Sequence, residues 1–191
     1  MTGGSRATAE GRVRPATIDD APSIAAIYND AVATTVATFD TEPRSLDAQR
    51  AWLREHTPPW AVWVAEASAS VVGWASLSRW SERKAYDSTA EVSVYVAAER
   101  RGQGWGGRLL DRLVLESDAA GFHTLLARVA DPNPVSLRLH LQRGFVPVGV
   151  MREVGRKFDR WVDVRLLQRL GPSSSAERPA GSTAATTGRQ S

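Results

Sequence analysis

The sequence predicts a mixed α/β fold in which a run of antiparallel strands passes into a β-α-β-α-β segment. Short windows of the first half read as strands separated by turn residues, whereas the second half alternates strand-like windows with helical apolar spacing. A chain of 191 residues with 42% hydrophobic residues can fill one core but is short for two typical domains. We therefore expect a single domain over residues 12–170. Residues 1–11 and 171–191, rich in small and polar residues, are expected to be flexible tails.

The N-terminal third predicts two helices after a short strand. The strand covers 13–16, and Thr17 with Asp20 has the spacing of a capping box that opens an amphipathic helix to about Ala33. A Thr-rich extended loop follows, and Ser45 can cap a second helix. The residues expected on the buried faces are Ile24, Ile27, Tyr28 and Ala31 in the first helix, and Leu46, Trp52 and Leu53 in the second.

The next segments predict a hairpin, a third strand and a long helix. Strands over 61–66 and 71–77 flank a Ser-rich turn, as in an antiparallel hairpin. A strand over 91–96 follows a polar loop, and apolar residues then recur at helical spacing from Trp105 until Gly121 ends the helix. The remaining elements are a strand over 125–130, a helix over 134–142, and strands over 145–151 and 162–168.

Composition excludes several classes of function. The net charge of +3 comes from scattered arginines, with only two lysines, so we expect no nucleic-acid partner. The absence of cysteine removes disulfides, thiolate nucleophiles and cysteine metal sites. The three histidines, at 56, 123 and 140, lack metal-ligand spacing, so no metal is expected. No signal-like or membrane-length apolar run occurs, which predicts a soluble cytoplasmic protein without a membrane partner.

The strongest local signal is a strand that enters a glycine-rich loop and then a helix. Four of the six residues 102–107 are glycine. Such a loop leaves backbone N–H groups and the positive end of the helix dipole pointing at one spot, which suits a pyrophosphate. A turn with purely conformational glycines would need only one or two.

Two nucleotide-binding alternatives compete for this loop. Gly102, Gly104 and Gly107 fit the dinucleotide fingerprint, with Asp131 as a candidate ribose-binding acid, which would indicate a dehydrogenase. That loop normally follows the first strand of its fold, whereas at least three strands precede this one. No Gly-Lys-Ser/Thr follows, so a nucleoside-triphosphate P-loop is excluded.

The pattern Arg101-x-x-Gly104-x-Gly106, directly after the strand ending Tyr95-Val96, resembles the acetyl-coenzyme A loop of the GCN5-related N-acetyltransferase (GNAT) superfamily. The resemblance implies the GNAT acyl-CoA N-acyltransferase fold, a mixed central sheet splayed in the middle and flanked by helices. It also implies acetyl-CoA as co-substrate.

A second motif follows in the expected order. Asn133-x-x-Ser136, then His140 and Gly144-Phe145, is similar to the next helix of the superfamily, which contacts the pantetheine arm. The residues that the two motifs together assign to acetyl-CoA are Val94, Tyr95, Val96, Arg101, Gly102, Gln103, Gly104, Trp105, Gly106, Gly107, Asn133 and Ser136.

Four further segments narrow the resemblance. Residues 13–17, 41–43, 85–91 and 157–163 resemble the phosphinothricin and methionine sulfoximine acetyltransferases, and the likeness spans about 12–170. It implies acetylation of the α-amine of a glutamate-like small molecule, in an enzyme that is often a homodimer. The segment 157–161 would be a connection near the pocket and the partner subunit.

The resemblance also implies catalytic roles. Acetyl transfer needs a neutral amine, so Glu91 is the candidate base, acting directly or through water, with Thr89 and Ser93 beside it. A backbone N–H of residues 94–96 would stabilise negative charge on the acetyl oxygen. His140 is a candidate general acid for the departing thiolate, or a helix residue that contacts the cofactor.

A glutamate-like substrate also needs cations and apolar walls. Arg83 fits the phosphinothricin-type pattern, Arg79 is a possible substitute, and Phe39 and Trp80 could form walls. The substrate-binding residues implied by the resemblance are Ser81, Glu82, Arg83, Tyr86, Glu91, Val92 and Ser93.

Without cysteine or a nucleophile elbow, direct attack by the amine is the expected mechanism. Three rivals stay open: a protein, peptide or polyamine acetyltransferase, a non-catalytic acetyl-CoA sensor, and the dehydrogenase.

Overall fold

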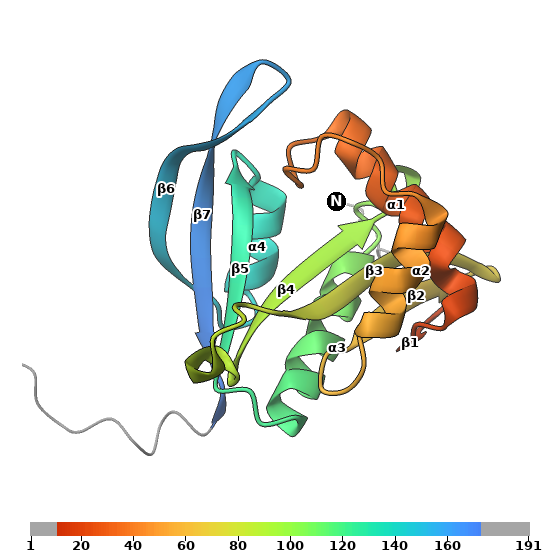
Figure 1. Ribbon diagram of the computed structural model, residues 1–191, viewed down its shortest axis with the longest axis horizontal. Helices are drawn as coiled ribbons and strands as arrows, with labels where there is room; N and C mark the ends of the chain where they lie inside the picture. The colour runs from red at the N-terminus through yellow and green to blue at the C-terminus, as the bar shows by residue number, and fades with distance from the viewer. Residues whose placement is uncertain (1–10, 173–191) are drawn as a thin grey trace, which may run out of the picture.

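The computed structural model of the protein describes residues 11–172 and arranges their seven strands in one mixed sheet (Figure 1). The strand order is β1-β2-β3-β4-β5-β7-β6, and every neighbouring pair is antiparallel except β4 and β5. The predicted mixed α/β fold is confirmed. The strands are β1 (Arg12–Pro15), β2 (Val62–Ala67), β3 (Ser70–Arg79), β4 (Thr89–Val96), β5 (Thr124–Asp131), β6 (Val146–Lys157) and β7 (Arg160–Leu170).

The expected tails, 1–11 and 171–191, lie almost wholly outside the described residues. The division into two tails and one domain over 12–170 therefore stays a prediction.

Helices cover both faces of the sheet. One face carries α1 and α2, which pack over an aromatic-rich cluster around Tyr28 and Trp74. The other face carries α3, whose Leu109, Leu110 and Leu113 are fully buried, and α4 lies beside it next to β5. The helices are α1 (Ala21–Thr34), α2 (Leu46–Glu55), α3 (Trp105–Ala119) and α4 (Pro134–Leu141), with short 3₁₀ turns at Ile18–Asp20, Lys84–Tyr86 and Ala98–Arg100.

The local start signals of the first two helices form as predicted. The Asp20 carboxylate accepts a hydrogen bond from the Thr17 backbone N–H (2.7 Å), and the Ser45 hydroxyl accepts one from a first-turn N–H of α2 (3.2 Å). The predicted inward position of Leu46 is wrong, because 37% of its surface is exposed. Gln49 is fully buried, and Trp52 and Leu53 pack against the aromatic cluster as predicted, so only the first position of the predicted inner face is exposed.

The parallel pair in the middle of the sheet is short. The β4–β5 ladder covers only Thr89↔Thr124 through Glu91↔Leu126, although β4 continues to Val96. Beyond that point the two strands diverge, as Figure 1 shows plainly. The sheet is thus splayed at its middle, as the resemblance implied.

The C-terminal hairpin differs from the expectation. The sequence predicted a strand ending at Met151 and a connection over 157–161, whereas β6 runs to Lys157 and turns tightly through Phe158 and Asp159 into β7. Most of β6 is exposed, and its pairing with β7 shifts register between Met151 and Gly155. Such a strand lacks the alternation of apolar and polar residues that marks a half-buried strand, so the sequence did not predict its full length.

The far end of β6 contacts the loop that follows α1. The buried Lys157 ammonium donates a hydrogen bond to the Thr38 carbonyl oxygen (2.9 Å), and desolvation lowers the pKa of Lys157. The Phe39 ring lies directly against Gly155, where a Cβ would overlap it. These contacts join the N-terminal loop to the C-terminal hairpin across the splayed sheet.

We expect Gly155→Ala to displace Phe39, because the added methyl and the ring cannot occupy the same space. The free energy of unfolding should fall by about 1–3 kcal/mol, the usual cost of overpacking. Gly149→Ala is the matched control on the same strand, since a Cβ there meets no atom within 4 Å. Chemical denaturation of both variants checks the contact, and equal losses in the two would contradict it.

Candidate active site

The splay between β4 and β5 opens into a cavity of about 1430 Å³. Its walls come from the end of α1 and the loop after it, from β4 and β5, from the glycine-rich loop, from α4 and from the β6–β7 hairpin. Ordinary small-molecule pockets measure about 300–1,000 Å³. The cavity is therefore large enough for two ligands that meet inside it.

The backbone of β4 faces this cavity with unpaired N–H groups. Ala97 donates its N–H to Val72 of β3 (3.0 Å), and Tyr95 pairs with the same strand. Because alternate residues of a strand point their backbone groups to opposite sides, the N–H groups of Val94 and Val96 point toward the gap. Among the predicted residues 94–96, the Tyr95 backbone therefore bonds to β3, and only the N–H groups of Val94 and Val96 can donate to a ligand in the gap.

The glycine-rich loop supplies further donors at the start of α3. Gly102 and Gly104 have φ angles of 76° and 88°, a left-handed backbone that side chains rarely adopt. Gly104 caps the helix, so the first N–H groups of α3 have no partner within the helix. Gly107 has no room for a side chain, because a Cβ there would lie 2.5 Å from the Arg143 guanidinium.

Most residues predicted to contact acetyl-CoA lie together at the cavity. The exception is Gln103, which does not line it and instead donates to the Glu99 carbonyl oxygen (3.3 Å). Arg101 lines the cavity and donates to the carbonyl oxygen of Val96 (3.2 Å). The residues that do line it are Val94, Tyr95, Val96, Arg101, Gly102, Gly104, Trp105, Gly106, Gly107, Asn133 and Ser136.

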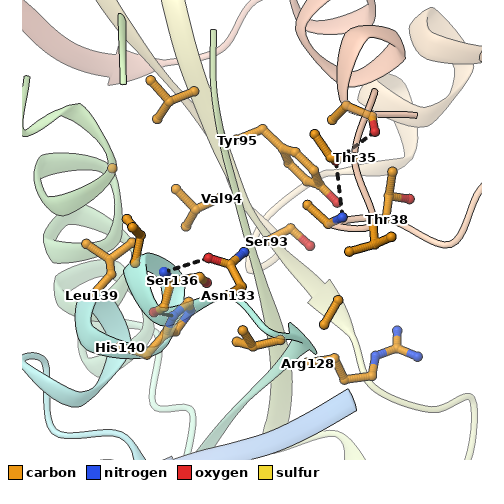
Figure 2. Close-up of a pocket in the computed structure, with 18 of the residues that line it drawn as sticks. Thr35, Thr38, Ser93, Val94, Tyr95, Arg128, Asn133, Ser136, Leu139 and His140 are labelled. Atoms are coloured by element: carbon orange, nitrogen blue, oxygen red, sulfur yellow. Dashed lines mark hydrogen bonds between the residues drawn. The ribbon is translucent and has the colours of Figure 1, made fainter. Parts of the chain in front are cut away.

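The N-terminus of α4 forms the opposite wall of this part of the cavity. The Asn133 side-chain oxygen accepts a hydrogen bond from the Ser136 backbone N–H (3.0 Å), which caps the helix and fixes the side-chain amide (Figure 2). The amide nitrogen keeps its two donors for another partner.

His140 lies one turn further along α4 and is 5% exposed. Its Nδ1 is 2.8 Å from the Ser136 carbonyl oxygen, and the ring packs edge-on against Phe145. Burial lowers the pKa of His140 below its ordinary value near 6.5. At neutral pH the ring is then uncharged, with the proton on Nδ1 and a lone pair on Nε2. That state suits a contact with the cofactor better than a proton donor.

Glu91 stands where the two strands part. Its carboxylate accepts two hydrogen bonds from Arg128 of β5, from Nε (2.6 Å) and from Nη2 (2.7 Å). This ion pair, which raises the pKa of Arg128, bridges the gap just past the last registered strand pair. Arg128 was not among the site residues predicted from the sequence, although it is a single arginine within the apolar run 125–130.

Figure 2 separates the cavity into two halves. Ser136 and His140 lie on one side, Thr35, Thr38 and Arg128 lie on the other, and Ser93 lies between them. The loop carrying Thr35 and Thr38 was predicted as an extended connection, from which Phe39 alone was expected to form a pocket wall, and Phe39 does line the cavity. Its position at the cavity depends on the packing of α1, which no local pattern reveals.

The loop predicted to hold the substrate is only partly at the cavity. Glu91, Val92 and Ser93 line it, whereas Ser81, Glu82, Arg83 and Tyr86 do not. Arg79 is paired with Asp87 (2.8 Å), and Trp80 contacts the Arg128 guanidinium (5.7 Å to the ring centroid). Within this chain, the arginine beside Glu91 is therefore Arg128 rather than Arg83 or Arg79.

Two further observations concern the residues that the structure describes. None of their helices is long and apolar enough to cross a bilayer. Residues 11–172 also contain no group of three or more His, Asp or Glu side chains arranged to hold a metal ion.

Comparison with known proteins gives a consistent result. Residues 24–145 match the model of the Acetyltransferase (GNAT) family. The chain is 38% identical over 169 residues to an L-methionine sulfoximine/L-methionine sulfone acetyltransferase of Pseudomonas aeruginosa, covering 86% of this chain and 97% of that protein. It is 39% identical over 166 residues to a phosphinothricin N-acetyltransferase of Streptomyces coelicolor, covering 85% and 97%.

The fold is also similar to that of a solved structure. The phosphinothricin acetyltransferase of Sinorhizobium meliloti, determined in complex with acetyl-CoA, superposes with a TM-score of 0.81 at 33% identity, over 94% of this chain and 99% of that one.

The environment of His140 generates a prediction about its protonation. Long-range ¹H–¹⁵N spectra at pH 7 should show the tautomer protonated at Nδ1, and the ring should titrate below pH 6.5 because burial disfavours its charged form. His140→Gln identifies the signal by removing it. A titration midpoint at or above 6.5 would restore the general-acid role.

Proposed function

The chain belongs to the GNAT family of acetyltransferases, and on that premise we propose that it transfers the acetyl group of acetyl-CoA to the α-amine of a glutamate-like small molecule. The observation that carries the proposal is the meeting of three features in one cavity: unpaired β4 N–H groups, a glycine-rich helix start and the Glu91 carboxylate. The relatives named for phosphinothricin and methionine sulfoximine support the substrate class.

The residues present fit acetyl-CoA as co-substrate. The α3 N-terminus with Arg100 and Arg101 offers backbone and side-chain donors to phosphates, and Arg138 of α4 adds a third cation at the cavity. The Val94 and Val96 N–H groups and the Asn133 amide face the same half of the cavity. Acetyl-CoA would supply a thioester carbonyl there for attack by an amine.

The chain's own groups then support direct attack. Glu91 takes a proton from the substrate ammonium, directly or through water, so that the amine nitrogen can bond to the acetyl carbon. The Val94 N–H is placed to stabilise the negative charge that develops on the acetyl oxygen. Coenzyme A leaves as its thiolate while the amide forms. A neutral His140 contacts the cofactor side, with solvent as the source of the thiolate's proton.

A thiol-release assay with acetyl-CoA tests the activity against phosphinothricin, methionine sulfoximine, glutamate and a peptide panel. We expect turnover on the amino-acid analogues, and a loss of about 10²–10⁴-fold in kcat for Glu91→Gln because the amine loses its base. Binding of acetyl-CoA should persist in that variant. Glu99→Gln, an exposed carboxylate outside the cavity, is the control. Turnover on peptides alone would overturn the substrate class, and binding without turnover would favour a sensor.

The proposal includes a homodimer formed through the hairpin. Large exposed apolar side chains gather on β6, β7 and the turn between them, and β6 is an edge strand. Such patches mark interaction surfaces. The hairpin patch comprises Val146, Val148, Val154, Phe158 and Trp161. The hairpin also lines the cavity through Met151 and Val154, so a partner docked on it would lie near the active site. A cytoplasmic location remains the sequence-based expectation.

Sedimentation or light scattering checks the dimer. We expect Phe158→Asp combined with Trp161→Asp to give monomers, because two charges would replace apolar contacts at the interface. Leu115→Asp alters an equally exposed side chain (58%, against 61% for Trp161) on α3 and should leave the mass unchanged. A wild-type monomer, or dimers that survive the double variant, would refute the hairpin interface.

A further inference from the structure

Arg128 keeps one edge of its guanidinium group available. The ion pair with Glu91 uses Nε and Nη2, which form the side edge of the group. A guanidinium carries five N–H donors, so both hydrogens of Nη1 and one of Nη2 remain. The Arg128 guanidinium also lies over the face of the Trp80 ring (5.7 Å to its centroid). The end edge of the fork can therefore take a second carboxylate without displacing Glu91.

This free edge belongs to the substrate half of the cavity. Arg128 lines the cavity and its side chain is 52% exposed. Figure 2 shows it on the side of Thr35 and Thr38, across from Ser136 and the other α4 residues. A ligand bound at this edge would thus contact Arg128 and Glu91 together, away from the side assigned to acetyl-CoA.

The charges of the pair change during the proposed reaction. Before proton transfer, Glu91 and Arg128 neutralise each other. When Glu91 accepts the proton of the ammonium, Arg128 loses its counter-charge. A second anion on the free edge of Arg128 would supply a new one. The substrate group next to an α-amine that can supply it is an α-carboxylate.

We propose that Arg128 is the receptor for the α-carboxylate of the substrate, and that it holds the α-amine against Glu91. The inference rests on the proposed acetyltransferase function and makes it more specific. Its substrates are free α-amino acids, since a polyamine has no carboxylate and the amine of a peptide N-terminus is flanked by an amide. A polyamine would also bring further positive charge toward Arg128.

A purely structural role is the alternative to exclude. Arg128 ties β5 to β4 across the splay and orients Glu91, so its removal could slow the reaction on every amine. If Arg128 binds the substrate carboxylate, its removal should lower activity more for a substrate with a carboxylate than for one without. The decisive quantity is therefore the ratio of kcat/KM for an α-amino acid to that for its α-carboxamide.

The experiment measures kcat/KM with acetyl-CoA for methionine sulfone and for methionine sulfone α-carboxamide, in the wild type, Arg128→Gln and Arg128→Lys. We expect the wild type to prefer the acid by about 10- to 100-fold, the usual value of a charge-assisted hydrogen-bonded pair. Arg128→Gln should abolish this preference and Arg128→Lys should restore part of it. Arg165→Gln is the control, because Arg165 pairs with Asp131 (2.8 Å) and does not line the cavity.

The outcomes separate the two proposals. Turnover in the wild type with the same acid-to-amide ratio in Arg128→Gln would refute the role of Arg128 while leaving the acetyltransferase function standing. Absence of turnover on both compounds in the wild type, with acetylation of peptides instead, would refute the proposed function and this inference with it.

Discussion

The early separation of β4 from β5 is the constraint on which the rest of the structure depends. Only three residue pairs, ending at Glu91↔Leu126, hold the two strands in register. Past them β4 has a backbone partner on its β3 side alone. The β4 donors at the gap belong to partly buried residues and line the cavity, so a ligand that supplies the missing acceptors can complete the ladder. The cavity therefore lies where the hydrogen-bond ladder between β4 and β5 stops.

A splayed sheet must be held open by contacts that replace the lost ladder. Two such contacts lie at the cavity. Arg128 bridges β5 to Glu91 with two short hydrogen bonds, and Lys157 of β6 reaches the Thr38 carbonyl oxygen in the loop after α1. Each joins segments far apart in the sequence. Arg128 also lines the cavity, and Lys157 holds the cavity-lining residue Thr38, so the geometry of the site and the stability of the fold are coupled.

The sequence predicted what local patterns encode. The glycine-rich helix start, the Ser45 cap and the order of strands and helices all depend on neighbours within a few residues, and the structure shows each of them. The Glu91–Arg128 pair spans 37 residues and follows from strand register. The long hairpin and the outward position of Leu46 depend on which faces are buried, which apolar spacing did not resolve.

The sequence predicted the cofactor half of the cavity better than the substrate half because the two halves are built from different groups. In the proposed function the cofactor half binds through backbone N–H groups and a helix start, so its sequence requirement reduces to small residues and a cap at fixed spacing. The substrate half is lined by side chains delivered by α1, β4, β5 and β6, which lie far apart in the sequence and leave no motif of fixed spacing. A motif can therefore identify the reaction while the substrate is selected elsewhere. In the proposed mechanism that selection falls to Arg128, the cation that is paired with Glu91.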